Sequence, residues 1–97
     1  MGKRKIIEII EKIKIQIEFH LEKLDNDLKN KDFELGFYHF KEFKKSFFPF
    51  LLRESEKINQ EEQTRDIIKS YEERLEKILK EYNCLEDFKK KFDDKFA

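Results

Sequence analysis

An apolar side chain at every helical turn is the feature that most constrains how this chain folds. Between residues 6 and 28 these positions recur at intervals of three or four, and at about 100° per residue they fall within an arc of roughly 80°. Such a stripe is typical of an amphipathic helix that packs one face on a core, and it predicts a helix from about Lys3 to Lys29. The stripe consists of Ile6, Ile10, Ile13, Ile17, Leu21, Leu24 and Leu28.

The rest of the composition supports an all-α chain with one core. Of 97 residues, 45% are charged, only three are glycine or proline, and valine is absent, a mixture that favours helix over strand. Eleven phenylalanines make the apolar positions large, so a chain of this length can bury a core without a disulfide or a metal. We therefore expect a single helical-bundle domain over residues 1–97.

The second predicted helix begins after Asp32, whose side chain can cap it, and runs to about Ile58. Pro49 lies inside this helix, lacks a backbone donor and clashes with the preceding turn, so a kink is expected near it. No capping residue stands just before Pro49, which favours a kink over a break. The core face expected from helical spacing is almost wholly aromatic: Phe33, Phe37, Phe40, Phe47, Phe48 and Leu51.

Two further helices complete the predicted fold. Asn59 followed by Glu62 has the form of a capping box, which predicts that the third helix starts at Asn59, and its apolar face continues to about Tyr82. Asn83 can close that helix in a left-handed conformation or cap a short last helix. Because the connections are short, successive helices should be antiparallel neighbours. The predicted fold is an antiparallel three-helix bundle with a short fourth C-terminal helix.

Several functional classes are disfavoured by composition. Twenty-two basic residues balance twenty-two acidic ones, so no field attracts nucleic acid or an anionic membrane. No apolar run approaches the roughly 20 residues that span a bilayer, and no signal peptide is recognised. The lone cysteine, Cys84, fits a reducing compartment, which predicts a cytoplasmic protein. No nucleophile motif or glycine-rich phosphate loop is present. We expect no enzyme activity, no cofactor and no small-molecule ligand.

Ile15 and Phe19 break the amphipathic pattern of the first helix. They are one turn apart and point about 180° away from the main stripe. Either the other helices wrap the first helix from several sides, or a partner covers these two residues. The second interpretation predicts a partner-binding surface for another protein or for a second copy of the chain. The function expected from it is a non-enzymatic interaction module.

The overall outline also resembles flagellar and type III export chaperones. The resemblance lies in a long helix, a short turn, an acidic and aromatic start at residues 31–35 (Lys-Asp-Phe-Glu-Leu), and two further helices. It spans most of the chain. It implies a small adaptor or chaperone-like bundle that displays a hydrophobic helix face to a protein partner.

A metal-binding bundle is the alternative function. His20 and His39 are the two histidines of the chain, and Glu42 follows His39 by one helical turn. His39 and Glu42 ahead of the Phe48-Pro49 pair resemble part of the hemerythrin-like pattern, in which a histidine and a later glutamate precede a Phe-Pro turn. The resemblance covers about a dozen residues and implies a degenerate metal site, with His20, His39 and Glu42 as candidate ligands. Histidines in ordinary hydrogen bonds are the competing interpretation.

Overall fold

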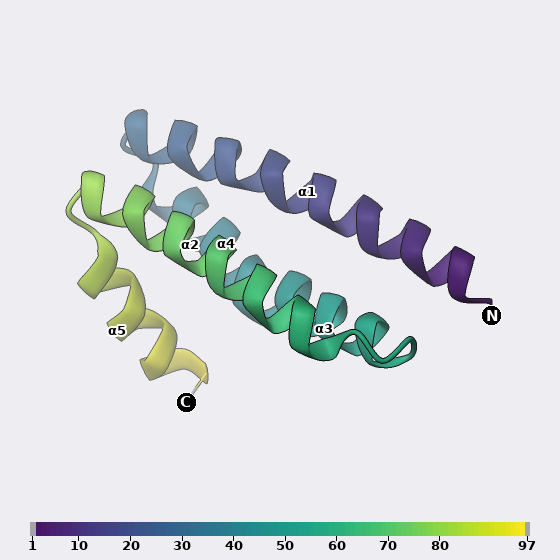
Figure 1. Cartoon of the computed structure of the whole chain (residues 1–97). Helices are drawn as coiled ribbons and strands as arrows, with labels where there is room; N and C mark the ends of the chain where they lie inside the picture. Colours follow the sequence, from purple (N-terminus) through teal and green to yellow (C-terminus); the bar gives the residue numbers. More distant parts are fainter. Residues whose placement is uncertain (1, 97) are drawn as a thin grey trace.

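A computed structural model describes residues 2–96 and contains helices but no strand in that range (Figure 1). The predicted all-α class is therefore confirmed. The helical elements are α1 (Lys3–Lys29), α2 (Phe33–Glu42), the π-helical segment η1 (Phe43–Phe47), α3 (Phe48–Glu56), α4 (Glu61–Glu81) and α5 (Leu85–Phe96).

Helix α1 has the bounds predicted from its stripe. The apolar stripe lies inward, with Ile13 partly buried and the other six members buried. At 1.5 Å per residue its 27 residues span about 40 Å, close to the longest dimension of the molecule, 43 Å. The length of α1 therefore matches the length of the molecule.

Residues 33–56 form one continuous helical segment whose middle is a π turn. It starts where predicted, because Asp32 accepts a hydrogen bond from the backbone of Leu35 at 3.2 Å. In η1 the amide of Phe48 donates to the carbonyl of Phe43, five residues back. Pro49 follows at once and has no amide to donate, which leaves the preceding turn free to widen. The kink near Pro49 stays a prediction, and the π turn is what the structure places there.

Helices α1, α3 and α4 end in the same type of turn. Lys31, Asn59 and Asn83 each adopt a left-handed backbone, with φ of 62°, 56° and 58°. In each turn the following amide bonds a carbonyl five residues back: Asp32 to Asp27, Gln60 to Ser55, and Cys84 to Leu79. These are Schellman motifs, which satisfy carbonyls at a helix end.

The capping box predicted at Asn59 and Glu62 is thus wrong. Asn59 closes the preceding helix instead, and α4 begins at Glu61 with no side-chain cap. Of the two roles predicted for Asn83, the structure shows the first, a left-handed backbone that closes α4, and α5 follows from Leu85.

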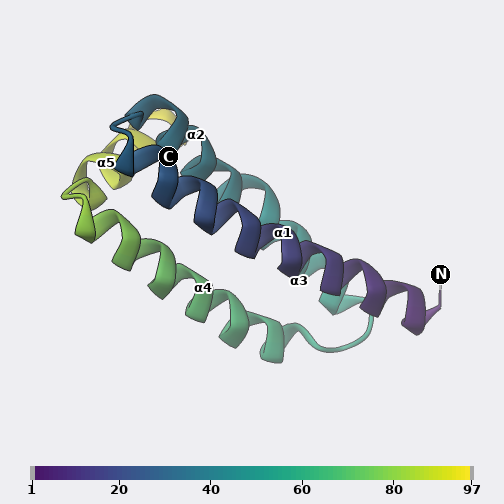
Figure 2. The ribbon, with the colours of Figure 1, turned by 90° about the horizontal axis from the view of Figure 1, so that it is seen from above.

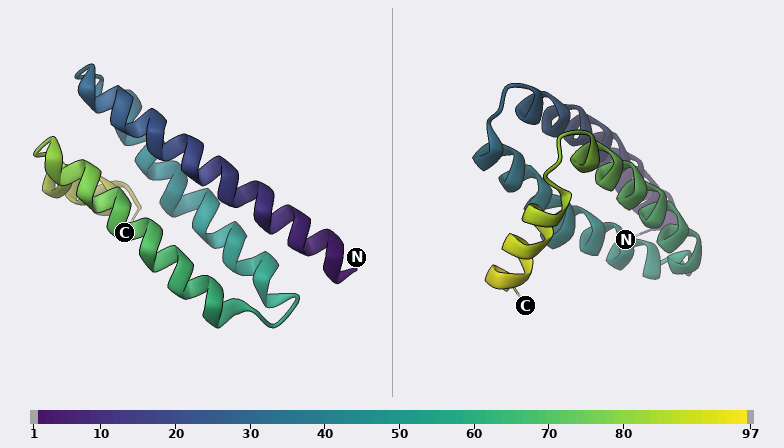
Figure 3. Two further views of the ribbon diagram at one scale, coloured as in Figure 1. Left: turned by 45° about the horizontal axis from the view of Figure 1, so that its top comes forward. Right: turned by 90° about the vertical axis from the view of Figure 1, so that its left-hand side faces the viewer.

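The long helical segments pack beside α1, and α5 packs on α2 and α4. The segment α2–η1–α3 runs along one side of α1 and α4 along another, while α5 crosses the end of the molecule at an angle (Figures 2 and 3). Aromatic side chains fill the space beneath α5, where Phe88 meets Phe37 and Phe40 with ring centroids 5.6 and 5.7 Å apart. The predicted core position of Phe33 is wrong, because that side chain lies largely exposed at the start of α2. Phe43, which was not in the predicted set, is fully buried, because it follows the buried Phe40 by three residues and so lies on the same side of the helix.

Two small residues matter for the packing near the turns. Gly36 lets α2 approach α1 closely, since a Cβ atom there would lie 2.9 Å from the buried Leu28 side chain. Cys84 is buried in the α4–α5 turn, where its thiol donates to the carbonyl of Leu79 at 3.6 Å. Burial raises the pKa of this thiol, which keeps it protonated and unreactive at neutral pH.

None of the helices described over residues 2–96 combines the length and the apolar character that crossing a bilayer requires.

Candidate metal centre

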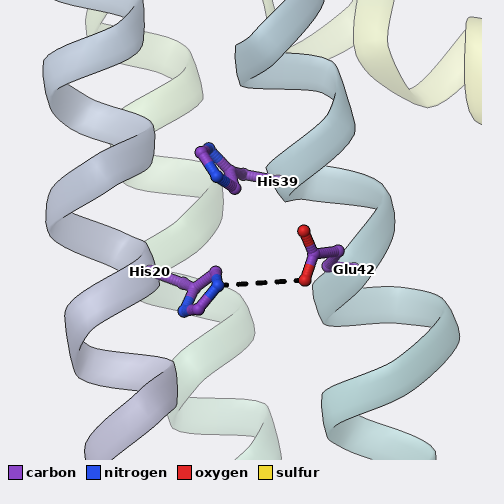
Figure 4. A group of neighbouring side chains, drawn as sticks. All are labelled: His20, His39 and Glu42. Carbon is purple, nitrogen blue, oxygen red and sulfur yellow. Dashed lines mark ion pairs between the residues drawn. The ribbon is translucent and has the colours of Figure 1, made fainter.

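His20, His39 and Glu42 converge between α1 and α2. His20 projects from α1, and His39 and Glu42 project toward it from successive turns of α2 (Figure 4). Each offers a nitrogen or oxygen atom, and these three atoms lie within 4.8 Å of one another. The two histidines and the glutamate named from the sequence therefore form one group in the folded chain.

The backbone of α1 fixes how the His20 ring is used. Its Nδ1 lies 2.8 Å from the carbonyl oxygen of Gln16. A carbonyl oxygen can only accept, so Nδ1 carries the hydrogen and Nε2 keeps its lone pair when the ring is neutral. That Nε2 lies 3.8 Å from a carboxylate oxygen of Glu42, beyond hydrogen-bond range (Figure 4). The ring is thus held with its free nitrogen facing an acidic group.

Asp27 does the same for His39. Its carboxylate oxygen accepts a hydrogen bond from Nδ1 of His39 at 2.6 Å, and both side chains are only 10% exposed. This contact leaves Nε2 of His39 as the free nitrogen. A carboxylate or carbonyl that holds the second ring nitrogen is the usual outer partner of a metal-binding histidine, because it sets the tautomer and the ring orientation. Here both histidines have such a partner.

The charge balance of the group favours a cation. Asp27 and Glu42 bring two carboxylates, and within residues 2–96 no lysine or arginine forms an ion pair with either. A neutral His20 turns a lone pair toward Glu42, which is unfavourable unless a positive charge lies between them. A metal ion supplies that charge, and protonation of His20 is the competing way to supply it.

One side of the group is apolar and another is open to solvent. The His20 ring packs edge-on against Phe47 at 4.7 Å and against Phe43 at 6.5 Å. The side chains of His20 and Glu42 remain 17% and 24% exposed. Aromatic walls reduce competition from water and strengthen charge interactions, while the opening gives an ion a path to the ligands.

The ligand spacing fits a single ion after a small closure. In a tetrahedral site with bonds of about 2.0–2.1 Å, ligand atoms lie about 3.4 Å apart. The separation of 3.8 Å between His20 and Glu42 is near that value, and a pair at the 4.8 Å limit of the group would have to approach by roughly 1.4 Å. Two nitrogens and one oxygen suit Zn²⁺ or another first-row divalent ion. Three protein ligands leave at least one position for water.

Asp27 is the residue of this site that sequence reasoning missed. Its place near the end of α1 is also typical of a polar turn, but it follows His20 by seven residues and therefore shares its face of the helix. That spacing was the available signal. The other predicted site residues, Ile15 and Phe19, lie outside this group, on the face of α1 opposite its buried stripe, and are 64% and 60% exposed.

No protein-family model, curated protein or solved structure matches this chain.

Proposed function

We propose that the chain is a metal-binding helical bundle that holds one divalent ion with His20, His39 and Glu42. The observation that carries the proposal is the orientation of the two imidazoles. Each has its Nδ1 hydrogen held by a protein acceptor, Gln16 or Asp27, so that the two Nε2 atoms are available beside one carboxylate. Both acceptors belong to α1 and are eleven residues apart, the carbonyl of Gln16 and the carboxylate of Asp27.

The proposed site takes a single ion. A carboxylate that bridges two metals in the hemerythrin-like pattern would stand four residues after His39, and that position is Phe43, which is fully buried in the core.

The proposal keeps the finer architecture predicted from the sequence, a single antiparallel three-helix domain with a bend at Pro49 and a short fourth helix. It also keeps the cytoplasmic location predicted from the lone cysteine, and it includes no catalytic role.

Titration of metal-free protein tests the site. Protein stripped with a chelator is titrated with Zn²⁺ by calorimetry and with Co²⁺ by visible absorbance. We expect one ion per chain, and a loss of affinity beyond about 100-fold in His20→Gln, His39→Gln and Glu42→Gln, because loss of a ligand exceeds the 10- to 100-fold cost of losing an outer partner.

Glu34→Gln is the matched control, because it removes an exposed carboxylate from the same helix as Glu42. Wild-type affinity in this variant is expected. Absence of stoichiometric binding to the wild-type chain, or wild-type affinity in the three ligand variants, would refute the proposed site.

A second function is supported by a different face of α1. We propose that the exposed pair Ile15 and Phe19 is a protein contact surface, as in a small adaptor or export-chaperone-like module. Both side chains are more than half exposed and neighbour each other along the helix. The double substitution Ile15→Lys with Phe19→Lys should leave the helical content unchanged and lower the mass of the assembly in solution. An unfolded double variant would contradict it, because it would place both residues inside the fold.

A further inference from the structure

The outer face of α1 carries a second regular band of residues. Its members recur at alternating intervals of four and three, all are exposed, and they lie opposite the buried stripe. This spacing is the seven-residue repeat of helices that pair with another helix. The band consists of Glu8, Lys12, Ile15, Phe19, Glu22 and Asn26.

The band is complementary to itself when it is reversed. Its midpoint falls between Ile15 and Phe19, and Lys12 and Glu22 lie equally far from that midpoint on either side. When two copies pack antiparallel about a two-fold axis at the midpoint, Ile15 meets the partner's Phe19 and Lys12 meets the partner's Glu22. Each of these contacts occurs twice.

We infer that α1 pairs with α1 of a second copy of this chain in this antiparallel register. The inference rests on the second function proposed above, that the outer face of α1 is a contact surface, and it is independent of the metal site. Two apolar layers form the centre of the contact and two opposite-charge layers flank it. The Lys23 ammonium, 5.7 Å from the centroid of the Phe19 ring, lies at the rim of the centre.

The charges also exclude the reverse orientation. In a parallel pair Lys12 would face the partner's Lys12 and Glu22 the partner's Glu22, so both flanking layers would carry like charges. The band thus specifies one orientation as well as one partner. An unrelated partner would need no such symmetry within the band.

The apolar centre limits the strength of this dimer. Only two large apolar side chains per copy are brought together, which is less than the core of a standard interface burying about 1,600 Å². We therefore expect a reversible, concentration-dependent dimer. Its weakness makes the charge layers decisive, because they contribute a large share of a small total.

Charge reversal tests the register. Sedimentation equilibrium is measured over a wide concentration range for wild type, K12E and E22K. Each single variant places like charges in both flanking layers, so we expect self-association to weaken by about 10-fold or more. An equimolar mixture of K12E and E22K restores opposite charges in every flanking layer, and it should associate at least as strongly as wild type.

Matched controls use the exposed outer surface of α4. K69E and E73K make the same charge changes there and should leave the wild-type association unchanged. Circular dichroism of every variant should match wild type, because all substituted positions are exposed.

The outcomes separate this inference from the contact surface on which it rests. If the Ile15→Lys, Phe19→Lys variant loses mass while K12E and E22K associate like wild type, the surface stands and the antiparallel register is refuted. K12E and E22K variants that each associate like wild type, with a mixture of the two that associates more strongly than wild type, would show a parallel pair and also refute it. A wild-type chain that stays monomeric at every concentration refutes self-pairing and leaves the surface to a different protein.

Discussion

Two of the polar contacts that helix α1 makes with neighbouring helices differ mainly in their exposure to water. On one side Asp27 accepts from His39 of α2 at 2.6 Å, with both side chains 10% exposed. On another side Glu18 binds Arg74 of α4 through two hydrogen bonds of 2.5 and 2.7 Å, with both side chains 49% exposed. The exposed contact has more bonds, full charges and the better-matched geometry.

The number and geometry of the bonds would rank the exposed contact as the more stabilising of the two, and that ranking is wrong. Water screens the Glu18–Arg74 pair, and exposed ion pairs contribute only about 0–1 kcal/mol. Asp27 and His39 cannot recover their lost bond from water if one partner is removed, so truncation costs more than the bond itself contributes. The difference indicates that α1 makes a weakly stabilising, solvent-exposed ion pair with α4 and a buried polar contact with α2 that is costly to disrupt.

The largest expected difference between the two contacts is their response to added metal. At a free Zn²⁺ concentration 100 times the dissociation constant, the free energy of unfolding should rise by about 2.7 kcal/mol, because the ion binds the folded chain. Arg74→Ala should show the same rise, while His20→Gln should show none. Chemical denaturation with and without Zn²⁺ measures it, and a rise that depended on Arg74 would invalidate the division between the two sides.

Removal of Asp27 should be the largest loss from a single contact. Asp27→Ala leaves the Nδ1 hydrogen of buried His39 without an acceptor, which costs about 1–3 kcal/mol of unfolding free energy. It should also weaken metal binding by about 10- to 100-fold. Asp27→Asn retains an acceptor oxygen and should recover most of the stability. Denaturation and metal titration of both variants check this, and an Asp27→Ala variant as stable as Glu18→Ala would contradict it.

The exposed pair should show a small and salt-sensitive coupling. A double-mutant cycle of Glu18→Ala and Arg74→Ala should give a coupling free energy below about 1 kcal/mol. It should shrink further in 1 M salt, where the screening length falls to about 3 Å. The same cycle for Asp27 and His39 should change little with salt. Equal salt dependence of the two cycles would show that burial does not distinguish them.

The pH dependence of the exposed pair should be smaller still. The hydrogen bonds and charge of Arg74 hold the pKa of Glu18 below its ordinary value of 4.5. A lowered pKa means that this contribution is present above 4.5 and is lost as the pH falls through the lowered value. Glu18→Gln should therefore be less stable than wild type by about 0.5 kcal/mol at pH 6, after allowance for screening. Denaturation should show this difference shrinking as the pH is lowered below 4.5, and a difference that grew toward low pH would contradict the prediction.

Local signals allowed much of the fold to be predicted. The bounds of α1 and the cap at Asp32 depend on periodicity and on a side chain three residues from its partner, and both agree with the structure. His20, His39 and Glu42 could be named from the sequence because the chain has only two histidines and Glu42 follows one of them by a single helical turn. Their proximity in the folded chain follows from an antiparallel α1 and α2, which a short turn favours.

The remaining differences depend on long-range packing or on backbone conformation. Lys31 and Asn59 adopt the same left-handed conformation, yet lysine gives no signal for it and asparagine also suits an N-cap. The role of Asp27 depends on the close approach of α2 to α1, which Gly36 permits and which no local pattern encodes.

The buried thiol of Cys84 makes it possible to measure local unfolding of the α4–α5 turn. A reagent that alkylates thiols can reach this sulfur only in molecules whose α4–α5 turn has come apart, because the side chain is buried and its pKa is raised. The rate of labelling therefore reports how often that end of the molecule unfolds locally, and no engineered probe is needed. Since the folded chain exposes no other sulfhydryl group, labelling can be followed in the same samples used for metal and association measurements.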